Sequence, residues 1–266
     1  MKNNDSSIRD RKARNGLKRC IKFLEKGKAV EAAIIATKVV KLNPNLAIGH
    51  LVRGRAYLEG NRINDAIESI KKSIAISETG EAYATLARAY DCLGKVRDTF
   101  ACFTKAIELD PKSPSIKNTA ANFMLNNGML SDAEKLFRHT ANLGDLNGLN
   151  GILLLLDRLG KYKEASDIIR KNQEIIDGSD GLKQIHAKIL LAMDKASESL
   201  AILNKLDSRN MTPNSAVNYF HLLGDAHHEL GSFDAAFRSY TNANNLRNIN
   251  YDSSRFEKEI SFLVKK

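Results

Sequence analysis

The sequence has few cysteines, no long apolar run and no segment rich in proline, glycine and serine that would separate two domains. Its three cysteines, Cys20, Cys92 and Cys102, match neither a disulfide framework nor a C-x-x-C metal pattern. Apolar runs such as Ile152–Leu156 are far shorter than the roughly 20 residues that span a bilayer. Residues 1–9 are polar, unlike a secretory signal. We therefore expect one continuous cytoplasmic unit without a membrane span.

The sequence also lacks the motifs of familiar enzyme classes. It contains neither a G-x-S-x-G nucleophile elbow nor an H-E-x-x-H metal pair. His221, Asp225 and His228 fall on one side of a helix at i, i+4 and i+7, which would suit a metal ion. Because only one helix contributes, we prefer to interpret them as a mixed polar face. We expect no catalytic residue, no cofactor and no metal.

The sequence does contain a clear internal repeat. Glycine, or an aspartate in its place, recurs at intervals of mostly 32 to 34 residues, as Gly27, Gly60, Gly94, Gly128, Gly160, Asp194 and Gly231. A small residue follows five or six positions later, as Ala32, Ala66, Thr99, Ala133, Ala165, Ser199 and Ala236. A large apolar residue comes about four positions further on, one turn along the same helical face. The chain is therefore predicted to repeat one structural unit along its length.

Each unit has the pattern of two helices. In the third unit, Tyr83, Leu86, Ala87 and Tyr90 form an apolar stripe at i, i+3, i+4 and i+7, and the pattern breaks at residues 93–95. A second stripe follows directly and ends before a proline, which cannot continue a helix interior. Neither helix could bury its stripe alone, so neighbouring units are expected to stack.

An acidic residue opens the second helix in six of the units. Such a carboxylate is stabilised by the helix dipole, so we interpret these residues as structural rather than catalytic. They are Glu31, Asp65, Asp98, Asp132, Glu164 and Glu198.

Residues 82–90, 92–95 and 106–111 resemble the tetratricopeptide repeat family. The resemblance implies an all-α, right-handed superhelical solenoid of about seven helix-turn-helix repeats. It would follow a polar basic segment, 1–12, and end in a capping helix, 251–266, that carries Phe256, Ile260 and Leu263 on one face. The expected units are about 13–46, 47–79, 80–113, 114–145, 146–179, 180–216 and 217–250.

The last repeat carries a narrower resemblance. Residues 223–226, 230–237 and 242–247 are similar to the final repeat of tetratricopeptide proteins that continue into a sulfotransferase domain. In those relatives, catalysis belongs to the following domain. One alternative function is therefore the recognition arm of a sulfotransferase-like protein that lacks its catalytic domain.

Family geometry also implies that the first helix of each unit lines a concave groove. Asparagine is over-represented at the groove positions, and successive carboxamides can hydrogen-bond the backbone of an extended peptide. The alternative is that these asparagines are ordinary polar residues on a solvated face. The predicted groove residues are Arg88, Asp91, Asn118, Asn122, Asn147, Asn150, Lys188, Asn218, His221 and Asp225.

The net charge of +10 is concentrated near the N-terminus, where nine basic residues lie between Arg9 and Lys28. A solvated basic end, an acidic protein partner, and a nucleic acid or anionic membrane surface are alternative interpretations. Nucleic acid is disfavoured because the predicted groove offers almost no aromatic rings for base stacking. The basic patch comprises Arg11, Lys12, Arg14, Lys18, Arg19 and Lys22.

The favoured hypothesis is a non-catalytic scaffold that binds a protein or extended peptide in its groove. The alternatives are the sulfotransferase-associated arm and a nucleic-acid or anionic-surface binder that uses the basic first repeat. A steep loss of binding with added salt would distinguish the last of these.

Overall fold

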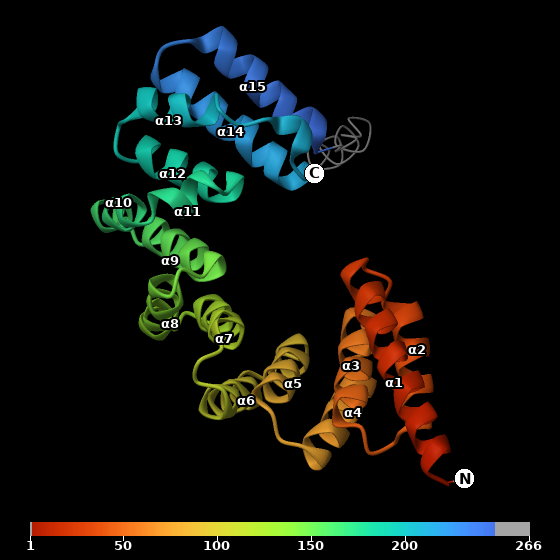
Figure 1. Cartoon of the computed structure of the whole chain (residues 1–266). Helices are drawn as coiled ribbons and strands as arrows, with labels where there is room; N and C mark the ends of the chain where they lie inside the picture. The colour runs from red at the N-terminus through yellow and green to blue at the C-terminus, as the bar shows by residue number, and fades with distance from the viewer. Residues whose placement is uncertain (1, 248–266) are drawn as a thin grey trace, which may run out of the picture. The chain divides into compact units, whose positions relative to one another are not determined.

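The computed structural model describes residues 2–247, with side chains from residue 11 onward, and all regular structure in this range is helical. Fifteen α-helices and one 3₁₀ turn follow one another along the chain (Figure 1). The predicted all-α fold is confirmed. The elements are α1 (Lys2–Glu25), α2 (Ala29–Leu42), α3 (Ala47–Glu59), α4 (Ile63–Ile76), α5 (Gly80–Cys92), α6 (Val96–Leu109), α7 (Pro114–Asn126), α8 (Leu130–Asn142), α9 (Leu146–Arg158), α10 (Tyr162–Lys171), α11 (Gln173–Asp177), α12 (Asp180–Leu191), α13 (Ala196–Leu203), η1 (Ser208–Asn210), α14 (Pro213–Glu229) and α15 (Phe233–Leu246).

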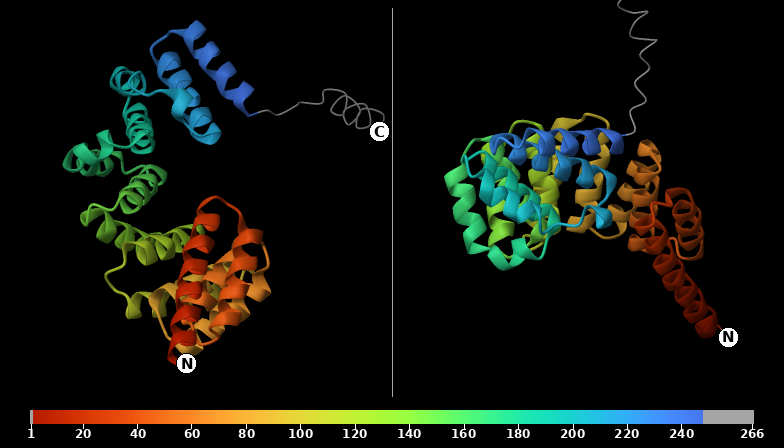
Figure 2. Two further views of the ribbon diagram at one scale, coloured as in Figure 1. Left: turned by 45° about the vertical axis from the view of Figure 1, so that its right-hand side comes forward. Right: turned by 90° about the horizontal axis from the view of Figure 1, so that it is seen from above.

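Consecutive helices pack as hairpins, and each hairpin packs on the next one along the chain. Hairpins of this kind are formed by α1 with α2, α3 with α4, α5 with α6, and α7 with α8 (Figure 2). Contacts of α2 with α3 and of α4 with α5 connect successive hairpins. Helices α12 to α15 repeat the arrangement. The chain divides into two compact units after Gly151, and within each unit the hairpins stack in chain order, as in a solenoid.

The turn inside each hairpin contains one residue with positive φ. Five of the predicted glycines have this conformation, namely Gly27, Gly94, Gly128, Gly160 and Gly231, and Asp194 has it as well. In the second hairpin Asn61 (φ 57°) adopts the left-handed conformation, whereas the neighbouring Gly60 (φ −84°) does not. Asparagine and aspartate tolerate this region better than other side chains, so glycine is not required at every turn.

The small residue in each second helix is buried where the two helices cross. Ala32, Ala66 and Thr99 are fully buried, and their counterparts in the other four second helices are 3% exposed or less. One turn further on, Phe103 and Phe137 are almost fully buried too. The recurring small and large residues are therefore the packing contacts of the hairpins, as their spacing predicted.

The six predicted acidic residues each lie in the first turn of a second helix. The residues that cap these helices form no side-chain capping bond, so the carboxylates supply negative charge near the positive end of the dipole. Asp65 additionally pairs with Arg62 at 2.7 Å. These positions support the structural interpretation.

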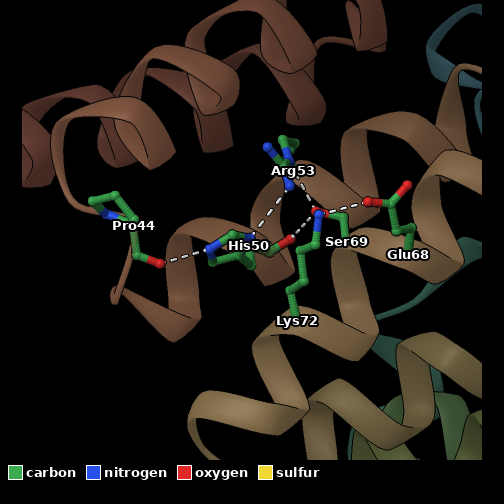
Figure 3. A network of polar contacts seen from close by, with 6 residues as sticks. All are labelled: Pro44, His50, Arg53, Glu68, Ser69 and Lys72. Atoms are coloured by element: carbon green, nitrogen blue, oxygen red, sulfur yellow. Dashed lines mark hydrogen bonds and ion pairs between the residues drawn. The ribbon is translucent and has the colours of Figure 1, made fainter.

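A polar network fastens the second hairpin (Figure 3). The buried His50 ring bonds to Arg53 through Nδ1 (3.3 Å) and to the Pro44 carbonyl through Nε2 (2.8 Å). A guanidinium has only donors, so Nδ1 accepts and Nε2 carries the hydrogen that binds Pro44. Ser69 accepts from Arg53 Nε (2.9 Å) and donates to the His50 carbonyl (2.9 Å), which joins α3 to α4.

The ends of the array differ from the predicted unit limits. Helix α1 begins at Lys2, within the segment expected to precede the repeats, and α14 begins at Pro213, where a start at residue 217 was expected. Pro213 suits a helix start because its missing amide hydrogen is not needed there. The predicted capping helix, 251–266, lies outside the described residues.

Candidate functional site on the first helices

Each first helix presents side chains to solvent at two fixed places, six and thirteen residues before the left-handed turn residue. All residues at these places are exposed except Arg55, which is half-buried, and one of the exposed residues, Gly181, has no side chain. The residues at the first of these places, six positions before the turn residue, are Ile21, Arg55, Arg88, Asn122, Leu154, Lys188 and Asp225. Those thirteen before it are Arg14, Ile48, Glu81, Ser115, Asn147, Gly181 and Asn218.

In the compact unit that ends at Gly151, the first helices of three successive hairpins form a hollow of about 160 Å³. Helix α3 contributes Arg55, helix α5 contributes Glu81 and Arg88, and helix α7 contributes Ser115 and Thr119. Arg55 Nη1 and Glu81 Oε1 lie 3.0 Å apart and join the second and third hairpins. The hollow therefore combines basic side chains with hydroxyl groups.

Arg88 is exposed and makes no ion pair with a described residue. Its neighbour Arg55 is already neutralised by Glu81. A guanidinium can bind a carboxylate through two parallel hydrogen bonds, and the hydroxyls of Ser115 and Thr119 can bind further polar groups. The arrangement suits an acidic or carboxylate-bearing ligand.

Asn118 differs from the prediction of an accessible groove side chain, because it is only 4% exposed. Its Oδ1 accepts from Thr140 Oγ1 at 2.6 Å, and its Nδ2 donates to Asp145 Oδ1 at 2.5 Å. The same Asp145 oxygen accepts from the Gly148 amide at 2.8 Å, in the first turn of α9. Asn118 therefore links successive repeats, and its hydrogen bonds are used within the protein.

The other predicted groove residues of the first unit are accessible. Asp91, Asn122 and Asn147 are exposed and Asn150 is half-buried. Asn122 and Asn147 make no side-chain hydrogen bond to a described residue. Their amides therefore remain available to a ligand.

In the second unit, two of the predicted residues have partners. Lys188 Nζ lies 2.7 Å from Asp157 Oδ2. Asp225 accepts from the Tyr240 hydroxyl at 2.8 Å, and burial together with this carboxylate raises the pKa of Tyr240 to about 12. Asn218 is exposed.

His221 is half-buried, and its Nε2 is buried without a hydrogen-bond partner. The ring lies beside that of Tyr240, with centroids 6.1 Å apart. Among residues 2–247, no three histidine, cysteine or acidic side chains converge as a metal site requires. The structure therefore does not assemble His221, Asp225 and His228 into a metal site.

The predicted basic patch lies on α1. All six of its side chains are exposed, and none forms an ion pair with a residue that the structure describes. Six cations within twelve residues raise the local positive potential. The patch is thus available to an acidic surface.

Sequence reasoning missed Arg55, Ser115 and Thr119. The position of the turn residue would have identified Arg55. When Asn61 is aligned with Gly94, Arg55 falls at the same position as Arg88, six residues before the turn residue. Ser115 lies thirteen residues before its turn residue, Gly128, which is the position of Glu81 relative to Gly94. Thr119 has no comparable signal, because its position at the hollow depends on how α7 packs.

Comparisons with known proteins agree with this architecture. Residues 80–113, which form α5 and α6, match the tetratricopeptide repeat family. A tetratricopeptide repeat protein from Parabacteroides merdae has 14% sequence identity and a TM-score of 0.60 over 93% of this chain and 97% of its own. The chain has the tetratricopeptide repeat fold.

Two further solved structures show the same fold. Pseudomonas aeruginosa pilF, with 14% identity and a TM-score of 0.62, aligns over 80% of this chain and 97% of its own. A thermophilic tetratricopeptide repeat protein of Thermus thermophilus, with 19% identity and a TM-score of 0.57, aligns over 67% and 99%. The comparison with curated protein sequences gives no match.

These findings support the tetratricopeptide resemblance but not the sulfotransferase resemblance of the last repeat. The fold also accounts for the absence of strands among the described residues. None of the described helices is long and apolar enough to cross a membrane.

Proposed function

We propose that the protein is a non-catalytic scaffold that binds an extended, acidic segment of a partner protein along α3, α5 and α7. Tetratricopeptide repeat proteins are generally non-catalytic scaffolds that bind peptides or proteins. The observation that carries the proposal is the exposed Arg88, which pairs with no described residue, at the hollow between these three helices.

The hollow accounts for both affinity and orientation. Arg88 binds a carboxylate of the partner, and the hydroxyls of Ser115 and Thr119 on α7 bind neighbouring polar groups. Beyond the hollow, the exposed amides of Asn122 and Asn147 can bind peptide backbone without demanding a particular side chain. Such a site would favour acidic peptides in an extended conformation.

The test is selection of a random peptide library on the immobilised full chain, followed by fluorescence polarisation of the enriched peptides. We expect enrichment of acidic residues. Arg88→Ala should weaken binding by about tenfold or more, since a hydrogen-bonded charged contact is worth about 1.5 to 3 kcal/mol. Arg97→Ala, the same change on the exposed part of α6, is the matched control and should bind normally.

If the Arg88→Ala and Arg97→Ala proteins bound the peptides equally well, the hollow would not be the binding site. The asparagines are tested in the same assay, where Asn122→Ala/Asn147→Ala should weaken binding without changing its preference for acidic peptides. Circular dichroism of each variant checks that the helices are retained.

The exposed cations of α1 support a second contact, with an acidic protein surface. Its test is the salt dependence of partner binding by the native chain and by Lys18→Ala/Lys22→Ala. The native slope should be steeper, because fewer ions are displaced when cations are removed. Identical slopes would exclude the patch. A cytoplasmic location is part of this proposal and agrees with the three free cysteines, Cys20, Cys92 and Cys102.

A further inference from the structure

Helix α2 carries an exposed apolar pair at its second and sixth positions, and no other second helix has apolar residues at both of these positions. Val30 is 67% exposed and Ile34 is 53% exposed, at the second and sixth positions of the helix. The second position is polar in every other second helix, as Asn64, Arg97, Ser131, Lys163, Ser197 and Asp234. The sixth is charged or alanine, as Glu68, Ala101, Lys135, Asp167, Ala201 and Arg238. The hairpin fold therefore does not require apolar residues here.

Val30 and Ile34 border a hollow of about 330 Å³ between α2 and the end of α3, which we call the α2 hollow. Ala33 and Ala56 also line it, and the half-buried Tyr57 contributes its ring. Its volume is at the lower end of the range for binding pockets, about 300 to 1,000 Å³. An exposed apolar surface beside such a hollow is typical of a contact site.

The charged side chains that line the α2 hollow are all basic. They are Lys38 and Lys41 of α2 and Arg62 at the following turn. Arg62 forms an ion pair with Asp65, and its Cζ lies 4.5 Å from the centre of the Tyr57 ring. Its charge is therefore already used within the protein. Lys38 and Lys41 are exposed and make no ion pair with a described residue. Two cations that no described residue neutralises thus lie next to the apolar surface.

We infer that the α2 hollow is a docking site for an acidic amphipathic segment of a partner protein. An apolar side chain of that segment occupies the hollow between Ile34 and Tyr57, and its carboxylates pair with Lys38 and Lys41. A second copy of this chain is the poorer occupant, because an isologous contact would bring the two sets of cations together. The site is separate from the hollow of Arg88, which lies on α3, α5 and α7.

The test uses the full chain and three fluorescein-labelled helical peptides that have leucine at i, i+3, i+4 and i+7 and glutamate on the opposite face. They differ only in the central anchor, which is leucine, phenylalanine or tryptophan, and each has a partner peptide with lysine in place of glutamate. Fluorescence polarisation gives the affinities. The main variant, Ile34→Glu, introduces the residue type that α4 has at the same position in Glu68, so the fold should tolerate it.

We expect at least one acidic peptide to bind and Ile34→Glu to weaken it by about tenfold or more, the order expected for loss of a buried apolar contact. Lys38→Ala/Lys41→Ala should weaken binding and flatten its salt dependence. Ala101→Glu, the same charge at the equivalent position of α6, should bind like the native chain. Because Ile34, Lys38 and Lys41 do not line the hollow of Arg88, binding there would not respond to these variants, and they therefore separate the two sites.

Three results would overturn the inference. The first is no binding by any of the acidic peptides, and the second is equal binding by the lysine peptides. The third is an affinity that Ile34→Glu leaves unchanged. Analytical ultracentrifugation supplies a further check, since a native dimer that Ile34→Glu dissociates would assign the α2 hollow to a second copy instead.

Discussion

Replacing Asn118 by alanine should destabilise the protein, even though this residue was predicted to face a ligand. The side chain is 4% exposed and makes two hydrogen bonds, one from the Thr140 hydroxyl and one to the Asp145 carboxylate. Alanine would remove both bonds and leave the Thr140 hydroxyl without this acceptor. It would also take one donor from the carboxylate that binds the first turn of α9.

The magnitude follows from these two bonds. A neutral hydrogen bond contributes about 0.5 to 1.5 kcal/mol and one to a charged group about 1.5 to 3 kcal/mol, so Asn118→Ala should lower the free energy of unfolding by about 2 to 4 kcal/mol. Asn122→Ala, four residues further along the same helix, is the matched control. Its side chain is exposed, and its effect should stay within about 0.5 kcal/mol.

Urea unfolding followed by circular dichroism measures the difference, provided that the slope of the transition is the same in the three proteins. If the slopes differ, amide hydrogen exchange in α7 and α9 reports the local loss of protection instead. Equal stabilities of Asn118→Ala and Asn122→Ala would refute the conclusion that Asn118 holds the fold.

Two further predictions concern packing and thiol chemistry. A Cβ atom on Gly224 would overlap the ring of Tyr240, so Gly224→Ala should destabilise the protein by about 1 to 3 kcal/mol in scanning calorimetry. Gly181→Ala, whose nearest atom would be 3.9 Å away, should not, and equal melting temperatures would contradict the packing argument. Burial raises the pKa of the Cys20 thiol to about 11 and raises that of Cys102, whereas Cys92 is exposed. Because the reactive thiolate is scarce when the pKa lies above the pH, only Cys92 should react rapidly with a disulfide reagent at neutral pH, and a second fast thiol in the native protein would contradict this.

The periodic features of the fold could be predicted because local packing dictates them. Thr99 and Ala133 recur in phase with the other small residues, since every hairpin needs a close crossing between its two helices. The turn of the second hairpin could not be placed as reliably. Gly60 and Asn61 are adjacent and both tolerate positive φ, so the choice between them depends on where α3 ends.

The candidate site could be predicted only in part, because accessibility depends on partners far away in the sequence. Asn118 and Asn122 are the same residue type on one helix, yet Thr140 and Asp145 bury the first and leave the second exposed. Val30 and Ile34 show the opposite case. Their i, i+4 spacing is typical of a buried stripe, and only the packing of α2 against its neighbours shows that they are exposed.

The shared backbone geometry of the seven hairpin turns has a consequence for how such an array can change. Since the turns and crossings repeat, a duplicated or deleted hairpin would still find a neighbour of the expected shape at each end. The side chains outside the crossings, such as Val30 on α2 or Arg97 on α6, carry no such restriction. Recognition can therefore diversify one hairpin at a time, while the framework that presents it is inherited unchanged.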